Sequence, residues 1–88
     1  KGVREIDIIA RYGGEEFCII LPDTDSKDAE LVANRLRESL AGLKTTISVG
    51  VATYPEDAKN SSSLIERADR MLYRAKQTGK NRVCVYGR

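Results

Sequence analysis

Two glutamates that follow two glycines are the residues with the clearest capacity for chemistry, within the sequence RYGGEEF at positions 11–17. Gly13 and Gly14 would let a ligand come close to the backbone, and their amide groups could face phosphate oxygens. The adjacent carboxylate of Glu15 could hold Mg²⁺, which often bridges a carboxylate and a substrate phosphate. One carboxylate is rarely a complete metal site, so a second acid would have to come from elsewhere. The same four residues also suit a plain hairpin turn with solvated acids, and the tetrapeptide alone does not separate the two interpretations.

The composition indicates one small globular domain. The chain has 88 residues, of which 41% are hydrophobic and 32% charged, and its net charge of +2 is too small to indicate a nucleic-acid partner. Histidine is absent, so any chemistry must come from carboxylates, lysine, arginine and backbone amides. Cys18 and Cys84 suggest two reduced thiols of a cytosolic protein, since two cysteines make neither a disulfide framework nor a zinc site. No apolar run is long enough to span a membrane, so this segment is not expected to insert into one.

Alternating apolar residues on both sides of the two glycines predict a β-hairpin. One strand is expected over residues 6–12 and a second over 15–21, where Pro22 ends it. A helix should follow, with Asp25 or Ser26 as its N-cap and Gly42 as its C-terminal stop.

The second half of the chain predicts a strand, a helix and a short last strand. Residues 45–53 alternate, and the small residues on one face would admit a close helix or backbone. Ser63 and Glu66 have capping-box spacing for the next helix, which Gly79 ends, although an earlier serine could be the true cap. Residues 83–86 make the last strand. The order β-β-α-β-α-β predicts an α+β fold with two helices on one face of an antiparallel sheet.

Three separated motifs follow one another along the chain: RYGGEEF at 11–17, TISVGVA at 46–52 and ADRMLYRAKQTGKN at 68–81. Together they resemble the second half of a GGDEF domain, the diguanylate cyclase family. The resemblance covers about residues 4–85, so residues 1–88 are interpreted as one partial GGDEF domain. It implies the β-β-α-β-α-β portion of a ferredoxin-like, nucleotide-cyclase palm fold, without the first strand and first helices of the family.

The resemblance implies a nucleotidyltransferase reaction: two GTP molecules condense to cyclic di-GMP and release two pyrophosphates. Two domains would each present one GTP, so a homodimer is needed. Glu15 would be a ligand of Mg²⁺ or Mn²⁺ and the base for the 3′-hydroxyl proton, and Glu16 would support the same catalytic site. Gly13 and Gly14 would lie against the nucleotide. This chemistry needs no histidine, because metal cations neutralise phosphate charge and positioning supplies most of the acceleration.

Lys76 and Lys80 match the phosphate-contacting positions of the family, around the end of the last helix. The simpler alternative for Lys76 is a solvated cation placed favourably near a helix C-terminus. The family often has arginine where Lys80 stands. A lysine keeps the charge but loses the bidentate fork of the guanidinium group.

Arg4 and Asp7 form an R-x-x-D pattern that matches the inhibitory product site of the family, where cyclic di-GMP binds. Arg35 on the first helix would be a second arginine of that site, although a solvated helix face explains it about as well. Asp7 and Gly13 would be about 20 Å apart along a strand, so the catalytic and inhibitory sites would occupy opposite ends of one hairpin. The alternative for Arg4 and Asp7 is a surface ion pair of little value.

The first half of the family's domain is absent from this sequence. It resembles a strand with an Asp-rich metal motif, followed by helices whose Asn and Asp read guanine. In the family that strand runs beside the strands that contain Phe17 and Val49, so its absence should leave an apolar gap with unpaired backbone groups. We therefore expect these 88 residues to be inactive alone and either to borrow a strand or to self-associate. The parent protein should carry an upstream sensory or receiver domain and act in the cytoplasm, as a cytoplasmic protein or as the cytoplasmic part of a membrane-bound sensor.

Two other functions compete with this interpretation. The first is a non-catalytic cyclic di-GMP-binding signalling domain that uses Arg4 and Asp7, but such domains usually resemble the family with a degenerate motif. The second, a small nucleic-acid binder, is weak because the chain has one Phe and little net charge.

Overall fold

The part of the chain that the structure describes contains two helices and four strands in the predicted β-β-α-β-α-β order. It is a computed structural model that describes residues 7–10, 15–41, 47–54 and 57–87. The expected hairpin turn at Gly13 and Gly14 and the expected helix stop at Gly42 lie outside these residues. The elements are β1 Asp7–Ala10, β2 Glu16–Pro22, α1 Ser26–Ala41, β3 Ser48–Tyr54, α2 Ser61–Gln77 and β4 Val83–Val85.

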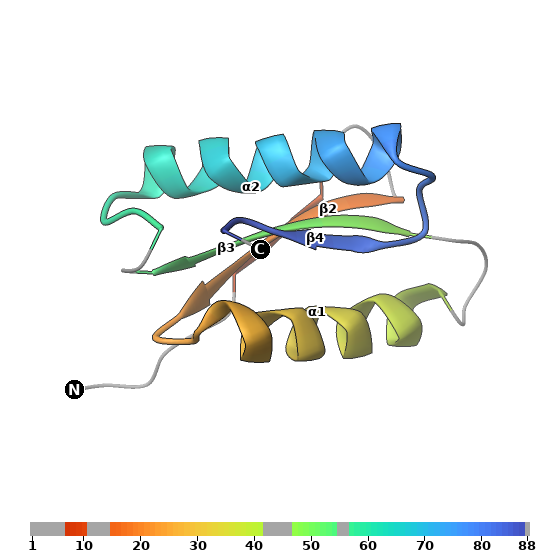
Figure 1. Cartoon of the computed structure of the whole chain (residues 1–88), viewed down its shortest axis with the longest axis horizontal. Helices are drawn as coiled ribbons and strands as arrows, with labels where there is room; N and C mark the ends of the chain where they lie inside the picture. Colours follow the sequence, from red (N-terminus) through yellow and green to blue (C-terminus); the bar gives the residue numbers. More distant parts are fainter. Residues whose placement is uncertain (1–6, 11–14, 42–46, 55–56, 88) are drawn as a thin grey trace.

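The two helices cover opposite faces of the sheet, with α2 on one side and α1 on the other (Figure 1). The prediction that both helices share one face was wrong. Strand β2 explains why, because it buries both sets of its alternating side chains. Ile19 and Leu21 pack with α1, whereas Cys18 and Ile20 pack with α2. A strand buried on both faces reads as a continuous apolar run, and CIIL at 18–21 is such a run.

The predicted antiparallel sheet was also wrong for two of the three strand pairings. The strands are ordered β1-β2-β3-β4. The hairpin pair β1–β2 is antiparallel, but β2–β3 and β3–β4 are parallel. The physical reason is that α1 and α2 each carry the chain back along the sheet, so the next strand starts at the same edge as the last.

Strands β2 and β3 pair directly, from Glu16 beside Ser48 to Pro22 beside Tyr54. The apolar gap expected between the strands of Phe17 and Val49 is therefore not present. Each strand supplies the backbone partners that the other needs. Strands β2, β3 and β4 follow one another across the sheet in one direction, whereas α1 and α2 lie on opposite faces. The β2-α1-β3 and β3-α2-β4 crossovers therefore have opposite hands, and one of them departs from the usual right-handed form.

Helix α2 approaches β3 closely at Gly50, as the small face of that strand predicts. A Cβ atom at Gly50 would lie 2.1 Å from the backbone oxygen of Ala68 and 2.2 Å from the backbone nitrogen of Leu72. Ala68 and Leu72 are fully or almost fully buried. The absence of a side chain at Gly50 therefore sets the distance between α2 and the sheet.

The helix ends are fixed by side-chain caps and by one left-handed turn. Asp25 caps α1, since its Oδ1 accepts the backbone N–H of Asp28 at 2.8 Å. The cap of α2 is Asn60, not Ser63 as the capping-box spacing predicted, and Asn60 Oδ1 accepts the N–H of Ser63 at 2.9 Å. Gly79 ends α2 as expected, with φ of +128°.

Replacing Asn60 with alanine should lower the free energy of unfolding by about 1 kcal/mol, because the first turn of α2 loses its cap. Urea denaturation followed by circular dichroism measures the change. Ser61→Ala alters the neighbouring exposed position without removing that cap and serves as the control. Equal midpoints for Asn60→Ala and the wild type would contradict this role of Asn60.

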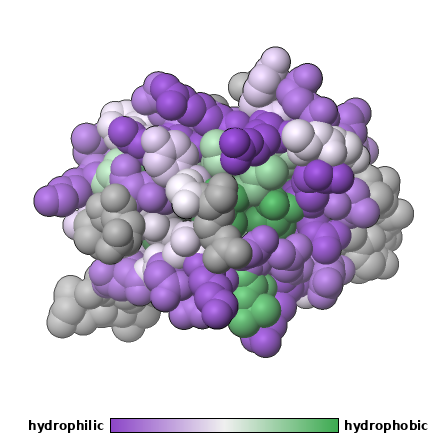
Figure 2. Space-filling view, viewed as in Figure 1, coloured by the Kyte–Doolittle hydropathy of each residue, from purple (hydrophilic) through white to green (hydrophobic). Residues whose placement is uncertain are grey.

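The face of the molecule seen in Figure 2 is mainly hydrophilic. Apolar residues show most clearly there between the two helices, where β4 is the outermost strand of the sheet. Within the described ranges, neither helix is both long enough and apolar enough to cross a membrane.

Candidate functional site

Charged residues that lie far apart in the sequence meet at the edge of the sheet where strand β2 starts. This edge is formed by strand ends and not by an outer strand. Strand β2 begins there with Glu16, and α2 reaches the same edge with its last turn. Lys76 Nζ donates to Glu16 Oε1 at 3.3 Å. The structure thus brings together two predicted site residues that are 60 positions apart in the chain.

The pair of Glu16 and Lys76 is half-buried rather than freely solvated. The side chain of Glu16 is 21% exposed and that of Lys76 is 30% exposed. Partial burial reduces solvent screening, so this ion pair is stronger than an ordinary surface pair. It ties the start of β2 to the end of α2 and fixes where the ammonium group of Lys76 stands.

Glu15 lies immediately before β2 and is exposed. Its backbone oxygen accepts the N–H of Ser48 at 3.0 Å, which holds this residue against the start of β3. The carboxylate of Glu15 is thus accessible on an anchored backbone, next to the Glu16–Lys76 pair. Gly13 and Gly14, which precede it, lie outside the described residues.

Lys80 sits on the loop that follows α2, in a left-handed conformation with φ of +61°. Its backbone N–H donates to Ala75 O at 2.8 Å, and its own carbonyl accepts Arg82 Nε at 3.2 Å. Asn81, also left-handed, accepts a hydrogen bond from Arg37 on α1 at 2.9 Å. The loop that carries Lys80 is therefore fixed to both helices, to α2 by the backbone of Lys80 and to α1 by the side chain of Asn81, and Lys80 itself is exposed.

Sequence reasoning missed Arg37, Asn81 and Arg82 as supports of this loop. The contact between Arg37 and Asn81 spans 44 positions and follows no local pattern. Four cationic residues lie in the last turns of α2 and the loop that follows: Arg74, Lys76, Lys80 and Arg82. They outnumber the two acidic residues at the start of β2, Glu15 and Glu16. Such an excess of positive charge favours a polyanion such as a phosphate chain.

No group of three or more Asp, Glu, His or Cys side chains that could hold a metal ion occurs among the residues that the structure describes. Glu15 is exposed and comes immediately before Glu16, the partner of Lys76. Mg²⁺ is commonly held by one or two carboxylates together with phosphate oxygens, so this donor suits a metal that arrives with its phosphate ligand.

Asp7, predicted for the inhibitory site, lies away from this edge. Asp7 pairs with Ile20 in the sheet, four positions along β2 from Glu16, which is roughly 13 Å at about 3.3 Å per residue. Arg35 is exposed on α1. Arg4 and the side chain of Asp7 are not among the described parts, so a shared site of these three residues stays a prediction.

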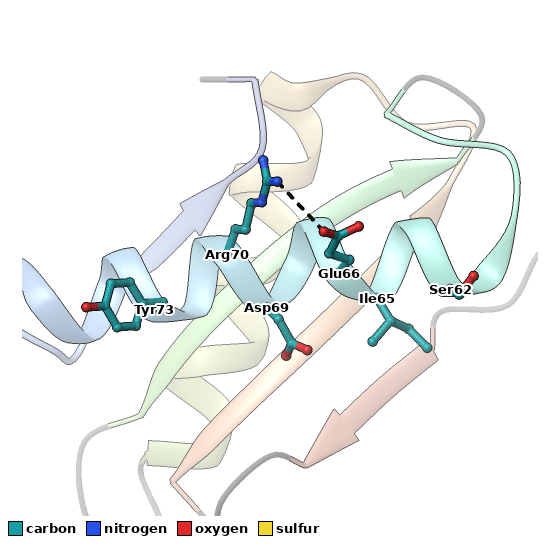
Figure 3. A pocket seen from close by; sticks show the side chains of 6 residues that line it. All are labelled: Ser62, Ile65, Glu66, Asp69, Arg70 and Tyr73. Carbon is teal, nitrogen blue, oxygen red and sulfur yellow. Dashed lines mark ion pairs between the residues drawn. The ribbon is translucent and has the colours of Figure 1, made fainter.

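A hollow of about 540 Å³ runs along the exposed flank of α2 but contains none of the predicted site residues (Figure 3). Its one drawn ion pair, Glu66 with Arg70 at 3.7 Å, is solvated and contributes little. Asp69 Oδ1 accepts the thiol of the buried Cys18 at 3.0 Å, a contact that no sequence pattern indicated. The lining residues are Ser62, Ile65, Glu66, Asp69, Arg70 and Tyr73.

An α+β domain that gathers carboxylates and lysines where its parallel strands begin has the groups that a metal-bound phosphate requires. This chain belongs to the GGDEF family, because the family model described as "Diguanylate cyclase, GGDEF domain" matches residues 1–82. The resemblance of the three sequence motifs is therefore confirmed, and the family is one of nucleotidyltransferases.

Curated relatives agree with this assignment. The chain is 43% identical to Diguanylate cyclase A of Treponema denticola over 93% of its own length and 24% of that protein. It is 40% identical to the response regulator PleD of Caulobacter vibrioides over 94% of the chain and 21% of PleD. It is 37% identical to Diguanylate cyclase DgcP of Pseudomonas aeruginosa over 97% of the chain and 14% of that protein. The chain thus spans a quarter or less of these relatives. No solved structure matches it.

Proposed function

We propose that this chain is the part of a diguanylate cyclase that carries the GGEEF motif and the phosphate-binding end of α2. The complete protein condenses two GTP molecules to cyclic di-GMP and releases two pyrophosphates. The observation that carries the proposal is the meeting of Glu16 and Lys76 within 3.3 Å at the edge where Glu15 is exposed. Cyclic di-GMP formed from GTP and Mg²⁺ by the protein containing this chain is the test, and absence of product in that assay contradicts the proposal.

Glu15, Lys76 and Lys80 each have a role that their positions support. Glu15 holds the metal ion and accepts the proton of the attacking 3′-hydroxyl group. Lys76 and Lys80 bind phosphate oxygens with their ammonium groups. Gly13 and Gly14 let the nucleotide approach the backbone. Mg²⁺, or Mn²⁺ in its place, supplies neutralisation of phosphate charge and alignment of the reacting groups when bound.

Two copies of the domain act together in this proposal. Each copy presents one GTP, and the 3′-hydroxyl of one nucleotide attacks the α-phosphate of the other. The edge described above is at one end of the sheet and its Glu15 is exposed, so it can face a second copy. An upstream sensory or receiver domain controls how the two copies meet, and the reaction takes place in the cytoplasm, where GTP is available.

These 88 residues make no cyclic di-GMP by themselves in this proposal. Glu15 supplies one carboxylate ligand in this proposal, and one carboxylate is rarely a complete metal site. The residues that read guanine and the second acidic ligand belong to the first half of the family's domain.

The product inhibits the enzyme at a second site made by Arg4, Asp7 and Arg35 in this proposal. Asp7 on β1 pairs with Ile20, which lies four residues along β2 from Glu16. This position supports a site that does not overlap the catalytic edge. Calorimetric titration with cyclic di-GMP should show binding by the wild type and at least about tenfold weaker binding by Arg4→Ala, because an arginine–phosphate contact is lost. Arg70→Ala, on the flank of α2, is the matched control. Equal affinities of wild type and Arg4→Ala would rule out this use of Arg4.

A further inference from the structure

The ion pair between Glu16 and Lys76 places a carboxylate where the proposed function requires a phosphate. Lys76 is the proposed phosphate ligand, yet its Nζ lies 3.3 Å from Glu16 Oε1. Both side chains are half-buried, so neither charge is fully screened by water. A phosphate oxygen that reaches Lys76 therefore meets the negative charge of Glu16 at the same place.

The two residues belong to separate elements that the core holds in place. Glu16 opens β2, whose following residues Cys18 and Ile19 are completely buried. Lys76 follows Ala75, which is completely buried under the last turn of α2. The backbone positions on both sides of the pair are thus anchored. Only the side chains can respond when a ligand enters, and a lysine stem is long and flexible enough to do so.

We infer that Glu16 is a positioning residue that holds Lys76 while the phosphate position is empty and yields it to an incoming phosphate. The inference rests on the proposed function of this edge and assigns Glu16 an action through Lys76 rather than on the metal. When the phosphate binds, the ammonium group turns from the carboxylate to the phosphate oxygen. When pyrophosphate leaves, the ion pair between Glu16 and Lys76 forms again, so the carboxylate favours product release.

This arrangement has a consequence that a merely structural ion pair does not have. Removing the charge of Glu16 should strengthen phosphate binding, because the carboxylate of Glu16 then no longer competes with the phosphate for the ammonium group of Lys76. The same change should slow pyrophosphate departure. In the cyclase that contains this chain, Glu16→Gln should lower KM for GTP and kcat together.

The direct test uses the full 88-residue chain and inorganic pyrophosphate with Mg²⁺ as the probe, with affinity measured by calorimetry. Glu16→Gln should bind pyrophosphate at least about threefold more tightly than the wild type at low salt, and the gain should shrink as salt screens the charges. Lys76→Met should bind more weakly. In the double variant, Glu16→Gln should give no gain, because its effect passes through Lys76.

Glu66→Gln is the matched control, since it removes one negative charge ten residues before Lys76, about 15 Å away along α2. It should leave pyrophosphate affinity unchanged, and circular dichroism should show that every variant is folded. Weaker binding by Glu16→Gln would mean that Glu16 serves the metal directly and would overturn the inference. Unchanged binding, or no binding by any of the proteins, would overturn it as well. Because no turnover is measured, this result is separate from a failure of the cyclase assay.

Discussion

Replacing Gly50 with alanine should cost the protein at least about 3 kcal/mol of stability and leave a large unfolded fraction at room temperature. The added Cβ would lie 2.1 Å from Ala68 O and 2.2 Å from Leu72 N. Both contacts are to backbone atoms of α2, which cannot move aside as the end of a flexible side chain could. The whole helix would have to shift away from β3 and lose the packing of Leu72 and Ala68. Urea denaturation measures the change in the free energy of unfolding.

Ser48→Ala is the matched control for this substitution. Ser48 lies on the same strand and the same face as Gly50 and is buried, but alanine adds no volume there. We expect its unfolding midpoint to stay close to that of the wild type. A Gly50→Ala protein as stable as the Ser48→Ala protein would show that α2 does not rest on β3 as described.

Replacing Glu15 with alanine should lower formation of cyclic di-GMP by at least about a hundredfold in the protein that contains this chain. Charge stabilisation by a bound metal is worth several kcal/mol, and each tenfold in rate corresponds to about 1.4 kcal/mol. Glu15 is exposed, so the substitution should not disturb folding. The rate of product formation from GTP, measured by chromatography at a Mg²⁺ concentration that just saturates the wild type, gives the effect.

Glu66→Ala, which removes an exposed carboxylate from the flank of α2, is the control for Glu15→Ala and should retain full activity. If Glu15→Ala and Glu66→Ala formed product at equal rates, Glu15 would have no part in catalysis. Raising the concentration of Mg²⁺ should recover part of the lost rate, because a site with one ligand fewer binds the metal more weakly.

Local sequence patterns were sufficient for the order of the elements and for two helix ends, the start of α1 and the end of α2. Gly79 was expected to end α2, and it does so in the left-handed conformation that favours glycine. Asp25 was one of two expected caps of α1 and caps it. The cap of α2 was missed because Asn60 and Ser63 are both capping residues three positions apart. Which of the two side chains caps the helix depends on the residue at which the helix starts, and here Asn60 accepts the capping hydrogen bond.

The direction of the strands and the placement of the helices could not be obtained from alternation alone. Phe17, Ile19 and Leu21 suggested one buried face, although Cys18 and Ile20 are apolar as well and bury the other. Parallel pairing of β2 with β3 depends on α1 bringing the chain back to the same edge, which is a property of the whole β-α-β unit.

The candidate site was predictable where a motif names its residues and was not where tertiary contacts support them. Glu16 and Lys76 were assigned to one site although 60 positions separate them, and the structure brings them together. The hydrogen bond from Arg37 to Asn81, which holds the loop of Lys80, was missed because neither residue belongs to a local pattern that signals the other.

In the proposed function, phosphate groups of GTP bind at the edge where β2 begins and α2 ends. The most direct measurement is a residue-resolved NMR titration of this chain with Mg²⁺ and GTP. We expect the signals of Glu16, Lys76 and Lys80 to shift, while Thr53 and Asp57, which line a hollow at the opposite edge of the sheet, stay in place. Shifts confined to Thr53 and Asp57, or no shifts at all, would contradict this placement of the phosphate groups.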